Sequence, residues 1–112
     1  MESTRQLKVA RLIQKELAEV FQREFRLTTA GTLISVTLVR ISPDLSFARV
    51  FLSIFGTTSP ETAFKEIQEH QIDLRRKLGA RIRKQLRIVP EITFILDDSV
   101  DYANKINELL KK

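Results

Sequence analysis

Cysteine and tryptophan are absent from this 112-residue chain, histidine occurs once, and glycine and proline occur three times each. Without cysteine there are no disulfides, thiolate nucleophiles or cysteine-based zinc sites, which fits a reducing cytoplasm. Three scattered glycines, at positions 31, 56 and 79, do not form a phosphate-binding loop. No apolar run approaches the roughly 18 residues of a membrane span, and the charged N-terminus does not resemble a signal peptide. We therefore expect a cytoplasmic protein with no membrane partner.

The composition that remains is that of a folded protein. Apolar residues make up 43% of the chain and charged residues 29%. The length fits one domain, so we expect residues 1–112 to form a single unit.

Candidate catalytic residues are few. His70 stands alone on a charged segment, and no serine has a recognisable base partner. Asp97, Asp98 and Asp101 lie close together, but carboxylates at a helix N-terminus are the simpler interpretation, because further metal ligands are missing. We expect no enzyme activity, metal, cofactor or small-molecule substrate.

Hydrophobic periodicity predicts an α-β-β-α-α-β-α order. Pro43 and Asp44 form a turn that makes the first two strands an antiparallel hairpin, and Pro90 ends the helical region before the third strand. A right-handed crossover would place that third strand parallel to a neighbour. The sequence thus predicts an α+β domain: a three-stranded mixed sheet with helices on one side. The expected helices are 4–25, 60–87 and 97–112, and the expected strands are 33–41, 45–55 and 91–96.

Two features of these elements have alternative interpretations. A helix over 60–87 is long for this domain, so we expect a break between about 70 and 80, and Gly79 is a plausible place for it. In the second strand, Phe47, Arg49, Phe51 and Phe55 share a face. Such a face can stack RNA bases. We favour the other interpretation, that helices cover the rings as core.

The segment from Leu74 to Arg87 has seven basic residues and no acidic one, so the rest of the chain sums to −2 against a total of +5. On a helical wheel its leucines and isoleucine form one arc. Most of its cations lie on the other side, where like charges repel unless a polyanion binds them. Arg75 lies near the apolar arc, where it can snorkel, cap a neighbouring element or mark a helix distortion. A membrane surface is disfavoured, because the apolar arc is needed for the core.

The first helix carries a second, weaker basic face, which is either solvated or a secondary polyanion contact. Glu16, Glu19 and Glu24 interrupt its charge. The candidate RNA-binding residues are therefore Arg5, Lys8, Arg11, Lys15, Arg76, Lys77, Arg81, Arg83, Lys84 and Arg87.

Two motifs, "ISPDLSFARVFLS" (41–53) and "LRRKLGARIRKQLRIVPEITFILDDS" (74–99), carry a family resemblance. The Asp-Leu turn, the Ala-Arg-Val strand start, the basic helix and the Pro-Glu that follows it resemble ribosome-binding factor A of bacteria. The resemblance covers essentially the whole chain. It implies a KH-like domain of type II order, α-β-β-α-α-β. It also implies a non-catalytic assembly factor that binds the immature small (30S) ribosomal subunit and its 16S rRNA, and supports late maturation and rRNA processing.

The chain departs from the family where its two central helices meet. KH domains carry Gly-x-x-Gly there and this family an Ala-x-Gly kink, whereas the positions aligned here are His70, Gln71 and Ile72. We expect a monomer whose partner is the small subunit and its rRNA. The alternatives are a generic KH-type module for single-stranded RNA, or a protein-interaction domain with an acidic partner.

Overall fold

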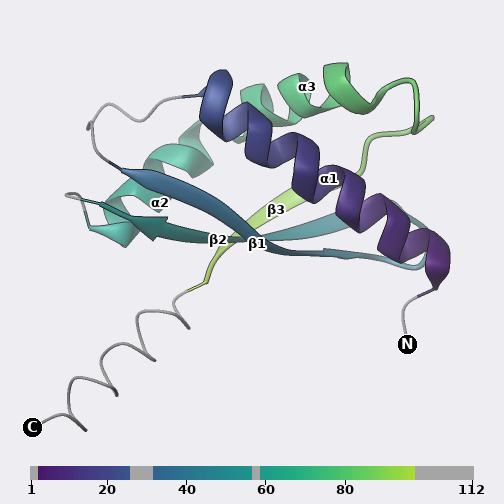
Figure 1. Ribbon diagram of the computed structural model, residues 1–112, viewed down its shortest axis with the longest axis horizontal. Helices are drawn as coiled ribbons and strands as arrows, with labels where there is room; N and C mark the ends of the chain where they lie inside the picture. The colour runs from purple at the N-terminus through teal and green to yellow at the C-terminus, as the bar shows by residue number, and fades with distance from the viewer. Residues whose placement is uncertain (1–2, 26–31, 57–58, 98–112) are drawn as a thin grey trace, which may run out of the picture.

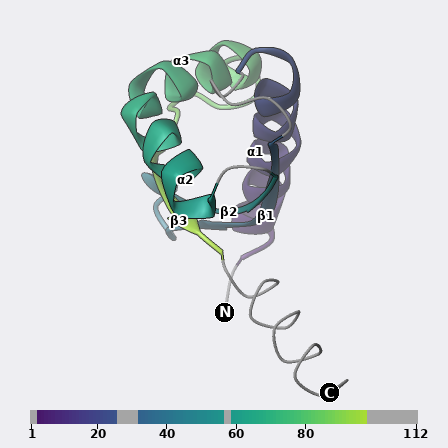
Figure 2. The ribbon, with the colours of Figure 1, turned by 90° about the vertical axis from the view of Figure 1, so that its left-hand side faces the viewer.

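The computed structural model describes residues 3–25, 32–56 and 59–97, and within them the helices and strands form two layers (Figure 1). All three described helices lie on one side of a three-stranded sheet (Figure 2). The predicted order and sidedness are confirmed, whereas the helix predicted over 97–112 falls almost entirely outside the described residues. The elements are α1 (Thr4–Arg23), β1 (Leu33–Ile41), β2 (Phe47–Phe55), α2 (Pro60–Glu69), α3 (Gln71–Ile82) and β3 (Glu91–Leu96).

The sheet has the order β1-β2-β3, with β1 and β2 antiparallel and β2 and β3 parallel. The mixed sheet is therefore confirmed, and α2 and α3 form the crossover between the parallel strands. The register places Arg40 opposite Arg49, and Arg49 opposite Thr93. A shift between Val36 and Leu38 marks a bulge in β1. Each strand thus presents one row of side chains to the helices and one row to the other side.

The hairpin turn is organised by one carboxylate. Asp44 Oδ1 accepts hydrogen bonds from Ser42 Oγ at 2.7 Å, from Ser46 Oγ at 2.7 Å and from the Ser46 backbone amide at 3.1 Å. These hydrogen bonds lower the pKa of Asp44 from 3.8 to about 2, and the bond from the Ser46 side chain has the largest effect. Leu45 adopts the left-handed backbone conformation, with a φ of 63°, which residues other than glycine rarely adopt. The carboxylate therefore fixes the point where β2 begins.

The core lies between the helices and one side of the sheet. Ile13 and Leu17 of α1, Leu78 of α3 and Leu52 of β2 are fully buried. Gln6 extends the capping box at Ser3, and its side-chain amide donates to the Ile41 carbonyl at 2.8 Å, which ties α1 to the end of β1. The apolar arcs predicted from periodicity are the ones that the structure buries.

The break between α2 and α3 falls within the predicted range but at His70, so the suggestion of Gly79 was wrong. His70 has φ −105° and ψ 17°, and its amide donates to the Ile67 carbonyl at 3.0 Å in a tight turn before α3 starts. Gly79 instead lies buried inside α3, where a Cβ atom would come within 3.4 Å of Val89 Cγ2. The glycine therefore allows close approach of the segment before β3.

The helical region also ends earlier than predicted. Regular helix stops at Ile82, and residues 83–85 form a turn in which the amides of Gln85 and Leu86 both donate to the Ile82 carbonyl at 2.9 Å. The last predicted turn of helix, with Arg83, Lys84 and Arg87, is consequently a connecting segment.

The phenylalanine face of β2 was assigned to the wrong side. The helices cover Ala48, Val50, Leu52 and Ile54, which are all buried. Phe47 is 56% exposed and lies on the open side of the sheet. Alternation separates two rows but does not say which one the helices cover. The row of β-branched and aliphatic side chains packs on the helices here.

Candidate nucleic-acid interface

Helices α1 and α3 lie side by side over the sheet and are joined by one arginine (Figures 1 and 2). Arg81 Nε donates to Glu24 Oε2 at 2.7 Å, and Arg81 Nη1 donates to Glu19 Oε2 at 2.7 Å and to Glu16 Oε2 at 3.2 Å. These contacts raise the pKa of Arg81 above its ordinary value, and the hydrogen bond to Glu24 has the largest effect. Arg81 therefore gathers the carboxylates of the first helix into the seam between the helices.

Asp73 and the end of α1 engage two more cations of the basic segment. Lys77 Nζ lies 3.1 Å from Asp73 Oδ2 and donates to the Glu24 carbonyl at 2.8 Å, which caps the C-terminus of α1. Arg76 also pairs with Asp73, but its side chain stays 79% exposed. Hydrogen bonds from Lys77 first and Arg76 second lower the pKa of Asp73. Much of the like-charge repulsion expected along α3 is therefore relieved within the molecule.

The structure shows the role of Arg75, for which the sequence left three possibilities open. Its Nε donates to the Pro90 carbonyl at 3.1 Å and its Nη2 to the Val89 carbonyl at 2.8 Å. The side chain thus caps the segment that leads into β3, and it turns away from the outward face of α3.

The remaining cations of the basic segment are the ones beyond the end of α3. Arg83, Lys84 and Arg87 are exposed, and no ion pair joins them to any residue that the structure describes. Arg87 lines a cleft of about 240 Å³ together with Arg5 from the start of α1 and the exposed Ile88. The fold thus brings Arg5 and Arg87 together although they are far apart in the sequence.

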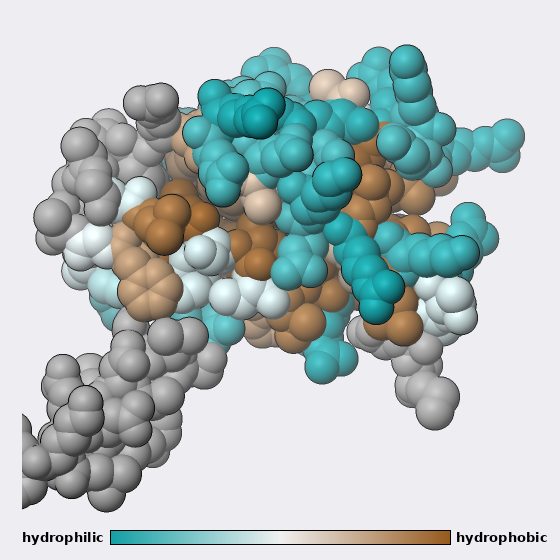
Figure 3. Space-filling model, viewed as in Figure 1, coloured by the Kyte–Doolittle hydropathy of each residue, from teal (hydrophilic) through white to brown (hydrophobic). Residues whose placement is uncertain are grey.

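The basic face of α1 continues from this cleft. Lys8, Arg11 and Lys15 are exposed on α1, on the arc away from its buried residues. Hydrophilic side chains cover the outer surface of α1 and project at the end of the molecule where α1 begins (Figure 3). We call Arg5, Lys8, Arg11, Lys15, Arg83, Lys84 and Arg87 the basic surface.

His70 and Asp97, considered from the sequence as catalytic or metal-binding candidates, make contacts within the fold. His70 Nδ1 lies 2.9 Å from the Glu66 carbonyl, and its ring meets the edge of Phe25 with centroids 5.4 Å apart. Among residues 3–25, 32–56 and 59–97, no three His, Cys, Asp or Glu side chains are grouped so that they could hold a metal ion. Asp97 accepts from Thr37 Oγ1 at 2.9 Å, while Asp98 and Asp101 lie outside the described residues. No helix in the described part of the chain is long and apolar enough to cross a membrane.

The structure also shows a surface that the sequence analysis set aside. Arg40, Phe47, Arg49 and Thr93 line a hollow of about 510 Å³ on the open side of the sheet. The alternation of basic and aromatic residues in β2 indicates such a surface. The sequence analysis nevertheless favoured helices that cover the phenylalanine rings.

The fold and the basic surface define a class: a small α+β domain of KH-like order whose cations gather on its helical side. A sequence model described as "Ribosome-binding factor A" matches residues 5–110. The chain is 54% identical to ribosome-binding factor A of Cytophaga hutchinsonii over 112 residues, which is the whole chain and 84% of that protein. The chain belongs to the ribosome-binding factor A family.

Solved structures agree with the fold. The crystal structure of ribosome-binding factor A from Thermus thermophilus is similar with a TM-score of 0.66 and 22% identity, over 81% of this chain and 94% of that one. A homology model of the Thermus thermophilus factor, fitted into a cryo-electron-microscopy map of its complex with the 30S subunit, also gives a TM-score of 0.66 and 22% identity. It covers 88% of this chain and 97% of that one. These likenesses support the KH-like α+β architecture.

Proposed function

We propose that this protein is a non-catalytic assembly factor that binds the immature small ribosomal subunit through its 16S rRNA. In this proposal it acts in the cytoplasm as a monomer and supports late maturation and rRNA processing. Membership of the family and the fitted Thermus thermophilus complex support the choice of partner.

The observation that carries the proposal is the sorting of charge on the helical side. Arg81 and Lys77 bind carboxylates and a carbonyl in the seam, so the acidic residues of α1 that could repel a phosphate backbone are already paired. Arg83, Lys84 and Arg87 are left exposed beyond α3. A polyanion that meets this end of the molecule finds cations from α1 and from the segment after α3, and it releases counterions as it binds.

Two kinds of cation therefore contribute differently. We propose that the basic surface contacts phosphates, with Arg76 at its margin because its side chain is largely exposed despite the Asp73 pair. Lys77 and Arg81 hold α1 against α3 and so fix the spacing between phosphate contacts. Contacts of this kind set position on the rRNA and read little sequence.

The test is co-sedimentation of the full chain with purified small-subunit precursor particles over a range of salt. The variant is Arg83→Gln with Arg87→Gln, and the matched control is Arg23→Gln with Lys65→Gln, which removes the same charge from exposed positions away from the basic surface. Each lost phosphate contact lowers the slope of log affinity against log salt by about 0.7 to 0.9, so the double variant should lose about 1.4 to 1.8.

Binding by the control should match the original chain, and the melting temperature of the double variant should be unchanged because both residues are exposed. Equal losses in both variants would show that only net charge matters. Salt-independent binding that survives nuclease digestion of the particles would favour an acidic protein partner and would overturn the proposal.

A further inference from the structure

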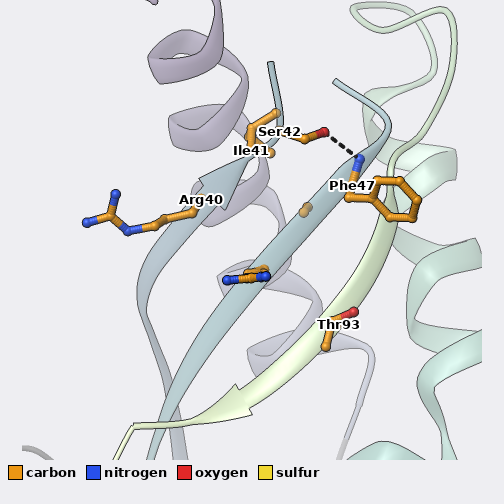
Figure 4. A pocket seen from close by; sticks show the side chains of 7 residues that line it. Arg40, Ile41, Ser42, Phe47 and Thr93 are labelled. Carbon is orange, nitrogen blue, oxygen red and sulfur yellow. Dashed lines mark hydrogen bonds between the residues drawn. The ribbon is translucent and has the colours of Figure 1, made fainter. Parts of the chain in front are cut away.

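The open side of the sheet carries a hollow at the end where β1 finishes and β2 and β3 begin. Arg40, Phe47, Arg49 and Thr93 are among its lining residues and come from three neighbouring strands. Figure 4 shows Phe47 and Thr93 on β2 and β3. Its volume of about 510 Å³ lies within the range of small-ligand sites. Its exposed lining residues alternate along the strands with the buried row that faces the helices, so they lie on the other side of the sheet from the basic surface. Figure 2 shows α1 and α3 together on one side of the sheet.

The two arginines of the hollow are placed against each other. Arg40 and Arg49 are direct cross-strand partners and both are exposed. Arg49 lies on the central strand, opposite Thr93 on β3, so it places a guanidinium group, which suits a phosphate, beside the residues of the hollow. Glu91, opposite Phe47 on β3, is the exposed carboxylate nearest in register.

Phe47 supplies an aromatic surface that is held in position. It is the first residue of β2 and remains 56% exposed. Its amide donates to Ser42 Oγ at 3.0 Å and its carbonyl accepts from the Ser42 amide at 2.9 Å, which locks the backbone under the ring (Figure 4). An exposed ring costs the protein hydrophobic burial. Nucleic-acid-binding proteins use such rings beside arginines to stack bases.

We propose that this hollow binds an unpaired nucleotide of RNA, with the base stacked on Phe47 and a phosphate bound by Arg49. Thr93, beside Arg49, offers a hydroxyl group to the ribose or the base edge. The inference rests on the proposed function only in taking the RNA to be that of the ribosomal subunit. Aromatic and cationic groups together favour a single strand over a duplex, whose bases are stacked internally and cannot reach the ring.

The direct test measures fluorescence anisotropy of a labelled uridine octanucleotide with the full chain. Phe47→Leu removes the stacking surface and keeps an apolar side chain, and should weaken binding about tenfold. Phe47→Tyr should restore it. Phe55→Leu is the matched control at the other end of the same face of β2, where the ring is 38% exposed, and should bind as the original chain does. Arg49→Gln should weaken binding and reduce its salt dependence.

Two further measurements keep the inference separate from the proposed function. Phe47→Leu should leave binding of a labelled RNA duplex unchanged, whereas Arg83→Gln with Arg87→Gln should weaken the duplex. If the Arg83 and Arg87 variant loses subunit binding while Phe47→Leu binds the octanucleotide normally, the inference fails and the proposed function stands. If octanucleotide binding depends on Phe47 while subunit binding does not change in the Arg83 and Arg87 variant, the inference stands and the proposed function fails. A poly-glutamate peptide that competes as well as the octanucleotide would show a site for acidic protein and would also overturn the inference.

Discussion

Arg81 offers a sharp test of how charge is divided between folding and binding. Its guanidinium group meets Glu16, Glu19 and Glu24, which all belong to the first helix or its C-terminal cap. Replacing Arg81 with methionine keeps a long, flexible side chain in the seam and removes every hydrogen bond to the carboxylates. Three negative charges are then left close together beside α3.

The expected loss of stability follows from the exposure of these groups. A hydrogen bond to a charged group contributes about 1.5 to 3 kcal/mol when well shielded, and much less at the surface. The four side chains are between 18% and 40% exposed, so the contacts are partly screened. We therefore expect Arg81→Met to lower the free energy of unfolding by about 2 kcal/mol, or the melting temperature by about 10 °C for a domain of this size.

Urea denaturation and thermal melting by circular dichroism measure the effect, with Arg83→Met as the control that changes an exposed cation without described ion pairs. The control should stay within about 0.5 kcal/mol of the original chain. Below its transition, Arg81→Met should still sediment with precursor particles. An unchanged melting temperature together with lost binding would refute the reasoning, because Arg81 would then contact RNA directly, as the sequence predicted.

Three further substitutions test other parts of the structure. Gly79→Ala should stabilise the chain by up to about 1 kcal/mol in urea denaturation, because the added Cβ only reaches ordinary contact with Val89; a loss would show that this segment must move away. Arg75→Ala should cost about 1 to 2 kcal/mol and speed amide exchange around Pro90, since two carbonyls lose their donor; unchanged exchange would contradict the cap. The pKa of Asp44 is lowered from 3.8 to about 2, so its contribution to stability is present above pH 4 and is lost as the pH falls toward 2. Asp44→Asn should therefore flatten the melting temperature between pH 5 and 2, and a pH profile parallel to that of the original chain would contradict this.

The elements of the fold were accessible from the sequence because local periodicity encodes them. Val9, Ile13 and Leu17 repeat at helical spacing, and all are buried. The turn at Asp44 rests on local backbone chemistry that needs no tertiary contact, whereas the helix ends at Ile82, well before the predicted stop at Pro90. The topology followed, since short connections and right-handed crossovers leave few arrangements for three strands.

The helix break predicted at Gly79 forms at His70 instead, because tertiary packing outweighs the low helix propensity of glycine. Glycine costs about 1 kcal/mol in a helix, which made Gly79 the natural place for a break. Tertiary packing instead keeps Gly79 helical, buried inside α3 where the segment at Val89 passes close to it. The turn formed at His70, where a backbone amide and the imidazole both find carbonyl acceptors.

The sequence alone determined the α+β fold class, through its hydrophobic periodicity, and the concentration of positive charge after Leu74. The tertiary structure decided which of those cations face solvent. Arg81 is 57 to 65 residues away from its carboxylate partners, and Arg87 lines the same cleft as Arg5, which lies near the other end of the chain. Ion pairing acts over a few ångströms in space and is indifferent to separation along the chain, so the basic surface exists only once α1 lies against α3.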